Sequence, residues 1–118
     1  FGDGLQLRDF NYVDDCVEAL LLAGSSDQAN GKVYNLGASE VIGLKDLAKI
    51  MVNLCHGGSF ELAPFPSERK AIDIGDYYSD FSLITKELGW TPKIDLKDGL
   101  ELTLNYYREH FSHYWDEK

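Results

Sequence analysis

The chain has 118 residues, 44% hydrophobic and 26% charged, an ordinary composition for one soluble globular domain. Twenty acidic residues outnumber 11 basic ones, giving a net charge of -9, which argues against nucleic acid and anionic membrane surfaces as partners. No apolar run approaches the ~20 residues that cross a bilayer, and no signal-peptide pattern is present.

Two further features bear on origin and location. Cys16 and Cys55 are too few for a disulfide framework, so we expect a reducing, cytoplasmic environment. Phe1 is followed at once by the turn-forming letters GDG, and no Met opens the chain. We therefore expect the chain to be a piece of a longer protein.

In chain order, the first predicted element is a strand over residues 5–13, where Phe10 and Tyr12 alternate with polar positions. A helix is predicted over residues 16–23, because Asp15 and Glu18 have the spacing of a capping box. The run VYNLG, residues 33–37, favours a short strand.

The second half begins with the clearest helical periodicity, over residues 44–55. Residues 60–65 (FELAPF) are predicted as an edge strand because of their proline, and residues 71–78 (AIDIGDYY) as extended chain. A short helix over 81–88 is predicted to be capped by Asp80 and ended by Gly89, and a last helix to follow Asp95. We therefore predict an α/β fold with mixed short strands and about four helices.

Two places in this acidic chain carry cations that can bind an anion. Arg8 stands in a strand-like apolar run, where its guanidinium must find a carboxylate or phosphate, or else reach water. Arg69 and Lys70 are adjacent, with Asp73 three residues beyond the lysine; two cations can clamp a diphosphate while a carboxylate accepts ribose hydroxyls. From the residues alone, a solvent-exposed arginine and a solvated loop stay open as alternatives.

Composition and spacing indicate no catalytic group. Asp14 and Asp15 are adjacent carboxylates, but a capping role for Asp15 explains one of them without chemistry. His110 and His113 lie one helical turn apart without an evident third ligand, so no metal site is expected. The sequence has no Ser-His-Asp order, no Walker motif and no GxGxxG.

Three segments nonetheless occur in an informative order: GDGLQLRDFNYVDD (2–15), VYNLG (33–37) and YYSDFSLITKELGWTPKIDLKDGLELTLNYY (77–107). Together they resemble the C-terminal part of the extended short-chain dehydrogenase/reductase family, the UDP-glucose 4-epimerase-like nucleotide-sugar epimerases and dehydratases. The resemblance implies that residues 1–118 are the small substrate-binding portion of a Rossmann-type fold. The NAD-binding N-terminal domain would be absent from this chain.

The resemblance also implies site residues. Arg8 would reach the diphosphate of a nucleotide-diphosphate sugar, and Asp73 would bind the ribose. Arg69 or Lys70 would take the place of the phosphate-binding arginine in the family's RxGD-like segment. Because RKAID departs from that pattern, both remain candidates, and we favour Arg69 since a guanidinium can bind phosphate bidentately.

The family's glycine-rich NAD turn and its catalytic Tyr-xxx-Lys pair are not recognised here, since Tyr77, Tyr78, Tyr106 and Tyr107 have no lysine four residues on. We expect a homodimeric parent enzyme that uses NAD to oxidise a sugar transiently at C4. This chain alone is expected to bind no NAD and to be inactive. A stand-alone binding module without chemistry, or one chain of a two-chain enzyme, are the alternatives.

Overall fold

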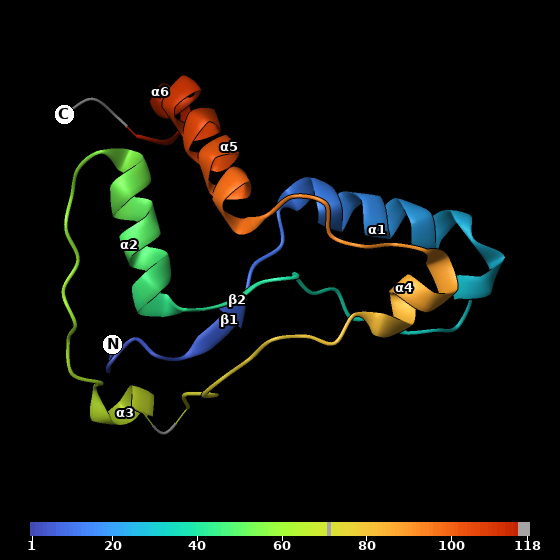
Figure 1. The fold of residues 1–118 in the computed structure, drawn as a ribbon, viewed down its shortest axis with the longest axis horizontal. Helices are drawn as coiled ribbons and strands as arrows, with labels where there is room; N and C mark the ends of the chain where they lie inside the picture. Colours follow the sequence, from blue (N-terminus) through green and yellow to red (C-terminus); the bar gives the residue numbers. More distant parts are fainter. Residues whose placement is uncertain (71, 116–118) are drawn as a thin grey trace.

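A three-residue strand, β1 (Leu7–Asp9), lies at the centre of this computed structural model, which describes residues 1–70 and 72–115 (Figure 1). The elements that follow are α1 (Val13–Ser25), η1 (Asp27–Ala29), β2 (Val41–Gly43), α2 (Leu44–Cys55), α3 (Ser67–Lys70), α4 (Ser82–Leu88), α5 (Leu96–Glu109) and α6 (Phe111–Tyr114). The predicted α/β class is confirmed.

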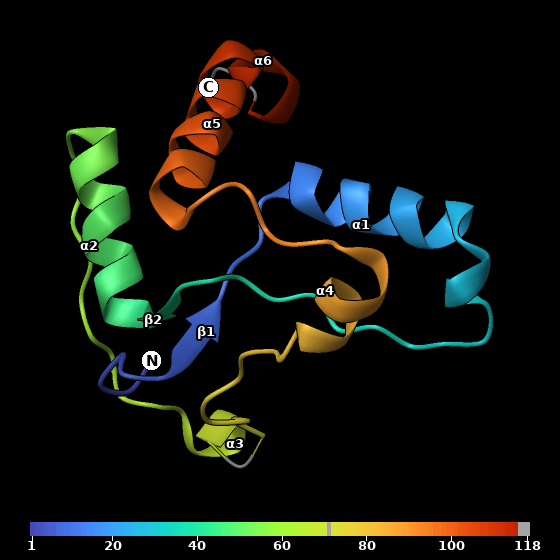
Figure 2. The same cartoon turned by 45° about the vertical axis from the view of Figure 1, so that its right-hand side comes forward.

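Two lobes diverge from this small sheet: α2 and α5 form one, and α1 and α4 form the other (Figures 1 and 2). The radius of gyration is 17.3 Å. A compact domain of this length has about 13 Å. The chain is therefore open, and much of its apolar surface faces outward.

β1 has a neighbour on each side. It pairs antiparallel with β2, with Arg8 opposite Ile42. On its other side it forms a parallel bridge to Tyr77, whose amide donates to the Leu7 carbonyl at 3.0 Å. The strand is shorter than the predicted 5–13, because Gly4 turns the chain with a φ of 70° before it and residues 10–12 lead into α1 after it.

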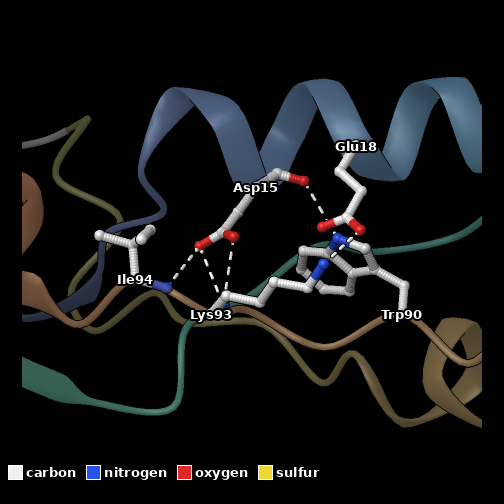
Figure 3. Close-up of polar contacts among 5 residues, drawn as sticks. All are labelled: Asp15, Glu18, Trp90, Lys93 and Ile94. Carbon is white, nitrogen blue, oxygen red and sulfur yellow. Dashed lines mark hydrogen bonds and ion pairs between the residues drawn. The ribbon is translucent and has the colours of Figure 1, made fainter.

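The capping prediction for Asp15 is wrong. Helix α1 begins at Val13, three residues earlier than predicted, and Tyr12 caps it without a side-chain hydrogen bond. Asp15 lies inside the first turn and is 3% exposed. Its carboxylate accepts the amides of Lys93 and Ile94, as Figure 3 shows. Tertiary contacts therefore use the oxygen atoms that the sequence pattern assigned to the helix end.

The main buried cluster joins α1, α4 and Trp90, which follows the Gly89 that ends α4. Ala19, Ile84 and Trp90 are almost fully buried, and five partly buried side chains pack around them: Leu22, Tyr34, Leu36, Phe81 and Leu88. Gly89 ends α4 in the left-handed region with a φ of 73°, which confirms the predicted C-terminal glycine. Helix α4 begins at Ser82, one residue later than predicted, and its N-cap is Phe81 rather than Asp80; Asp80 still accepts the Ser82 amide at 2.8 Å from just before the cap.

Of the remaining predictions, those for α2 and for the start of α5 are confirmed, and those for two strands are wrong. α2 has the predicted bounds, and α5 begins after Asp95, whose side chain accepts the Asp98 amide at 2.9 Å. The predicted strands at 33–37 and 60–65 are wrong, because these segments lack a neighbouring strand to pair with. In the predicted extended run 71–78, residue 71 lies outside the described residues. No described helix is both long and apolar enough to cross a membrane.

Candidate functional site

Arg8 is held at its place by backbone carbonyls. Its Nη1 donates to the carbonyl oxygens of Leu7 at 2.7 Å and Gly75 at 2.6 Å, and the residue is half-buried. Within residues 1–70 and 72–115 no carboxylate pairs with it, and its Nε and Nη2 make no hydrogen bond. The guanidinium is thus oriented by one edge while its other donors stay available to an anion.

Hydrogen bonds to two carboxylates, one from β1 and one from the segment 75–79, hold this segment beside β1. Asp76 Oδ1 accepts the Leu7 amide at 2.8 Å, and Asp9 Oδ2 accepts the Ser79 amide at 3.1 Å. Asp9 also accepts the Ala38 amide at 3.3 Å. These contacts bring the chain just beyond Asp73 against Arg8.

The other predicted cations lie on α3, a single helical turn that the sequence analysis treated as a loop. Arg69 is exposed, and its guanidinium carbon lies 5.7 Å from the centroid of the Phe1 ring, a cation–π arrangement. Phe1 itself packs against Phe65, with ring centroids 5.9 Å apart. Lys70 and Asp73 are exposed.

The four predicted residues do not form a closed site in this structure. No hydrogen bond or ion pair among the described residues joins Arg69, Lys70 or Asp73 to Arg8. What the structure adds is the link between them: residues 75–77 run beside Arg8, and Phe1 lies under Arg69.

Sequence reasoning missed Asp76 as a member of this region. It faces β1 from 69 positions later in the chain, and no local pattern marks such a contact. Phe1 was read only as the start of the chain, although its ring supports Arg69.

The sequence analysis also passed over one tyrosine at the family spacing, Tyr114, which stands four residues before Lys118. Lys118 lies outside the described residues. The Tyr114 hydroxyl is 3.2 Å from that of Tyr106, and this hydrogen bond raises the pKa of Tyr114. A catalytic base needs a lowered pKa instead, so the hydrogen bond from Tyr106 works against that role.

The connection from β1 to α1 lacks the glycine-rich form of a dinucleotide-binding turn. β1 leads into α1 through Phe10, Asn11 and Tyr12, with no glycine that would let a pyrophosphate approach the helix amides. Within the part of the chain that the structure describes, no three His, Cys, Asp or Glu side chains gather as a metal site.

A hollow of about 290 Å³ lies between α2 and α5, and none of its lining residues is a cation. Its lining is mainly apolar, and it includes Leu47, Met51 and Leu100. Asp95 is the charged side chain in its lining. Lacking a cation, this hollow does not suit a phosphate, and we place the candidate site at Arg8.

Known proteins show similarity over almost the whole chain. The sequence profile of the family described as GDP-mannose 4,6 dehydratase matches residues 1–103. A dTDP-glucose 4,6-dehydratase of Streptomyces griseus is 33% identical over 116 residues, which is 98% of this chain and 34% of that protein.

Solved structures show the same fold. A UDP-glucose 4-epimerase of Thermotoga maritima, solved with UDP-glucose, superposes with a TM-score of 0.81 at 32% identity, over 94% of this chain and 34% of that one. A UDP-glucuronic acid 4-epimerase of Bacillus cereus, solved with NAD, gives a TM-score of 0.76 at 27% identity, over 94% and 34%.

This chain spans about one third of the length of each of these relatives. The profile match covers the residues that carry the candidate site, including Arg8, Arg69, Lys70 and Asp73. The chain therefore belongs to the extended short-chain dehydrogenase/reductase family of nucleotide-sugar epimerases and dehydratases.

Proposed function

We propose that this chain is the nucleotide-sugar-binding part of an NAD-dependent sugar epimerase or dehydratase. In this proposal Arg8 and either Arg69 or Lys70 bind the diphosphate, and Asp73 binds the ribose. The observation that carries it is the guanidinium of Arg8, half-buried in a chain of net charge -9 and yet without a carboxylate partner in the described residues.

The Arg8 side chain is already oriented before an anion binds. Two carbonyls hold one nitrogen of Arg8, so little side-chain entropy is lost when an anion binds the remaining donors. Charge-assisted hydrogen bonds to phosphate oxygens are stronger than neutral ones. A carboxylate bound to Arg8 would compete with the phosphate, and within residues 1–70 and 72–115 no carboxylate forms an ion pair with Arg8.

In a whole enzyme of this kind, NAD supplies the hydride acceptor for transient oxidation of the sugar at C4. Because no glycine-rich turn joins β1 to α1, we assign the described residues to substrate binding alone and expect no activity from the 118 residues by themselves. A homodimeric enzyme in the cytoplasm stays a prediction.

The outer face of α1 supports a place within a larger assembly. Leu20 and Leu21 are each 69% exposed, and Val17 is 46% exposed on the same helix. Exposed apolar patches of this kind mark surfaces that contact other protein. We expect a further part of the parent enzyme to cover this face.

The test is calorimetric titration of the intact gene product with UDP-glucose, dTDP-glucose and GDP-mannose. We expect one of them to bind and Arg8→Ala to weaken that binding at least ~10-fold, which is ~1.4 kcal/mol. Arg108→Ala, on the exposed surface of α5, is the matched control and should bind as the unaltered protein does. Unchanged affinity in Arg8→Ala would refute the phosphate assignment.

The intact mass of the product in its source cell separates the alternatives. A mass several times the chain's 13.3 kDa indicates a longer enzyme that contains this chain. A mass near 13.3 kDa indicates a stand-alone binding module or one chain of a two-chain enzyme. Co-purification of an NAD-binding partner would then favour the two-chain enzyme.

A further inference from the structure

Two carboxylates flank Arg8 and tie its strand to the segment 75–79. Asp76 binds the amide of Leu7, the residue before Arg8, and Asp9 binds the amide of Ser79 from the residue after it. Strand β1 and the segment 75–79 thus each supply a carboxylate to the other. Neither bond uses the guanidinium itself.

These bonds matter because the backbone pairing is short. β1 has three residues, and its backbone pairing with the segment 75–79 is a single bridge between Arg8 and Tyr77. Such short pairing specifies register weakly by itself. A slip by one residue would remove the Gly75 carbonyl from Arg8 Nη1, where it now accepts at 2.6 Å.

We propose that Asp76 and Asp9 are positioning residues for the nucleotide diphosphate, an inference that rests on the proposed function. By fixing the register of the segment, they keep Gly75 against Arg8 and so aim the remaining guanidinium donors.

The negative charge of Asp76 makes its proposed positioning role testable. Carboxylates close to Arg8 oppose the binding of an anion. A role in positioning and a purely electrostatic role therefore predict opposite effects when Asp76 is truncated. Asp76→Asn removes the charge but keeps an oxygen that can accept the Leu7 amide, whereas Asp76→Ala removes both.

The experiment measures the affinity of the intact gene product for the nucleotide sugar that binds among UDP-glucose, dTDP-glucose and GDP-mannose. We expect Asp76→Ala to bind at least fivefold more weakly and Asp76→Asn to bind as well as, or better than, the unaltered protein. Glu101→Ala, which removes an exposed carboxylate from α5, is the control for charge and should not weaken binding.

A double variant distinguishes a positioning role that acts through Arg8 from a general destabilisation of the protein. If Asp76 acts through Arg8, adding Asp76→Ala to Arg8→Ala should cost no further affinity. Hydrogen exchange of the peptide containing Leu7 should also become faster in Asp76→Ala and stay slow in Asp76→Asn.

Each outcome has one meaning. Equal or tighter binding by Asp76→Ala, with Arg8→Ala still weak, overturns the positioning role and leaves the proposed function standing. A further loss in the double variant also overturns it, because the effect then does not pass through Arg8. Failure of the unaltered protein to bind any of the three sugars overturns the proposed function and this inference together.

Discussion

The indole Nε1 of Trp90 donates a hydrogen bond of 3.0 Å to the backbone carbonyl of Asp15, 75 positions earlier in the chain (Figure 3). The carboxylate of the same aspartate accepts the amides of Lys93 and Ile94 at 3.1 Å. Lys93 also forms an ion pair with Glu18, one turn further along α1. The first turns of α1 are thereby joined to the connection between α4 and α5.

Removing the Asp15 carboxylate should destabilise the fold strongly. Asp15→Ala leaves two amides without acceptors, and hydrogen bonds to charged groups contribute about 1.5–3 kcal/mol each, so we expect a loss of about 3 kcal/mol. Urea denaturation measures this free energy of unfolding. Asp14→Ala, at the exposed neighbouring position, is the control and should change it by less than about 0.5 kcal/mol. Equal effects of the two would contradict the assigned contacts.

Two glycines should respond oppositely to alanine. Gly89 has a φ of 73°, so Gly89→Ala should cost about 1 kcal/mol through backbone strain. Gly24 lies within α1, and the position that an alanine Cβ would take there is open. Gly24→Ala should therefore raise the free energy of unfolding by about 0.5–1 kcal/mol through higher helix propensity. Thermal unfolding of the pair is the measurement, and shifts of the same sign would count against the described backbone.

The stability contributed by Tyr34 should depend on pH. Its hydroxyl donates to Glu87 at 2.6 Å, and this hydrogen bond raises the pKa of Tyr34 to about 12. A raised pKa means that the folded state holds the proton more tightly. The advantage of Tyr34 over Tyr34→Phe is therefore complete below pH 10, the ordinary value, and disappears as the pH rises through 12.

Denaturation of both proteins across this pH range, with phenolate absorbance to follow ionisation, measures the effect. A constant difference up to pH 12 would show that the hydrogen bond does not form. Lys32 also binds Glu87, at 2.7 Å, and this contact is the main cause that lowers the pKa of Glu87.

Arg69 and Lys70 can be separated by substitution. We expect Arg69→Ala to weaken nucleotide-sugar binding about 10-fold and Lys70→Ala to weaken it less, because a guanidinium can bind phosphate bidentately. The ring of Phe1 lies against Arg69 and favours one orientation of its side chain. Calorimetric titration decides between them, and a larger loss in Lys70→Ala would assign the contact to the lysine.

Local sequence patterns determined where helices α2, α4 and α5 lie and which residue types stand at the candidate site. Residues 44–55 repeat apolar side chains at helical spacing, and Asp95 and Gly89 mark helix ends, since capping depends on a few neighbouring residues. Arg8 and the cations near residue 70 were identified from charge in an acidic chain and from family resemblance. These features need no knowledge of distant contacts.

The tertiary structure alone decided which distant groups meet. Asp15 has the spacing of a helix cap, yet its carboxylate binds amides 78 and 79 positions away, because those amides are otherwise without acceptors. Strands at 33–37 and 60–65 did not form, since β structure requires a partner that sequence periodicity cannot supply. The same reason explains why the sequence did not indicate Asp76: its hydrogen bond joins it to Leu7, 69 positions away, and only the folded chain brings the two together.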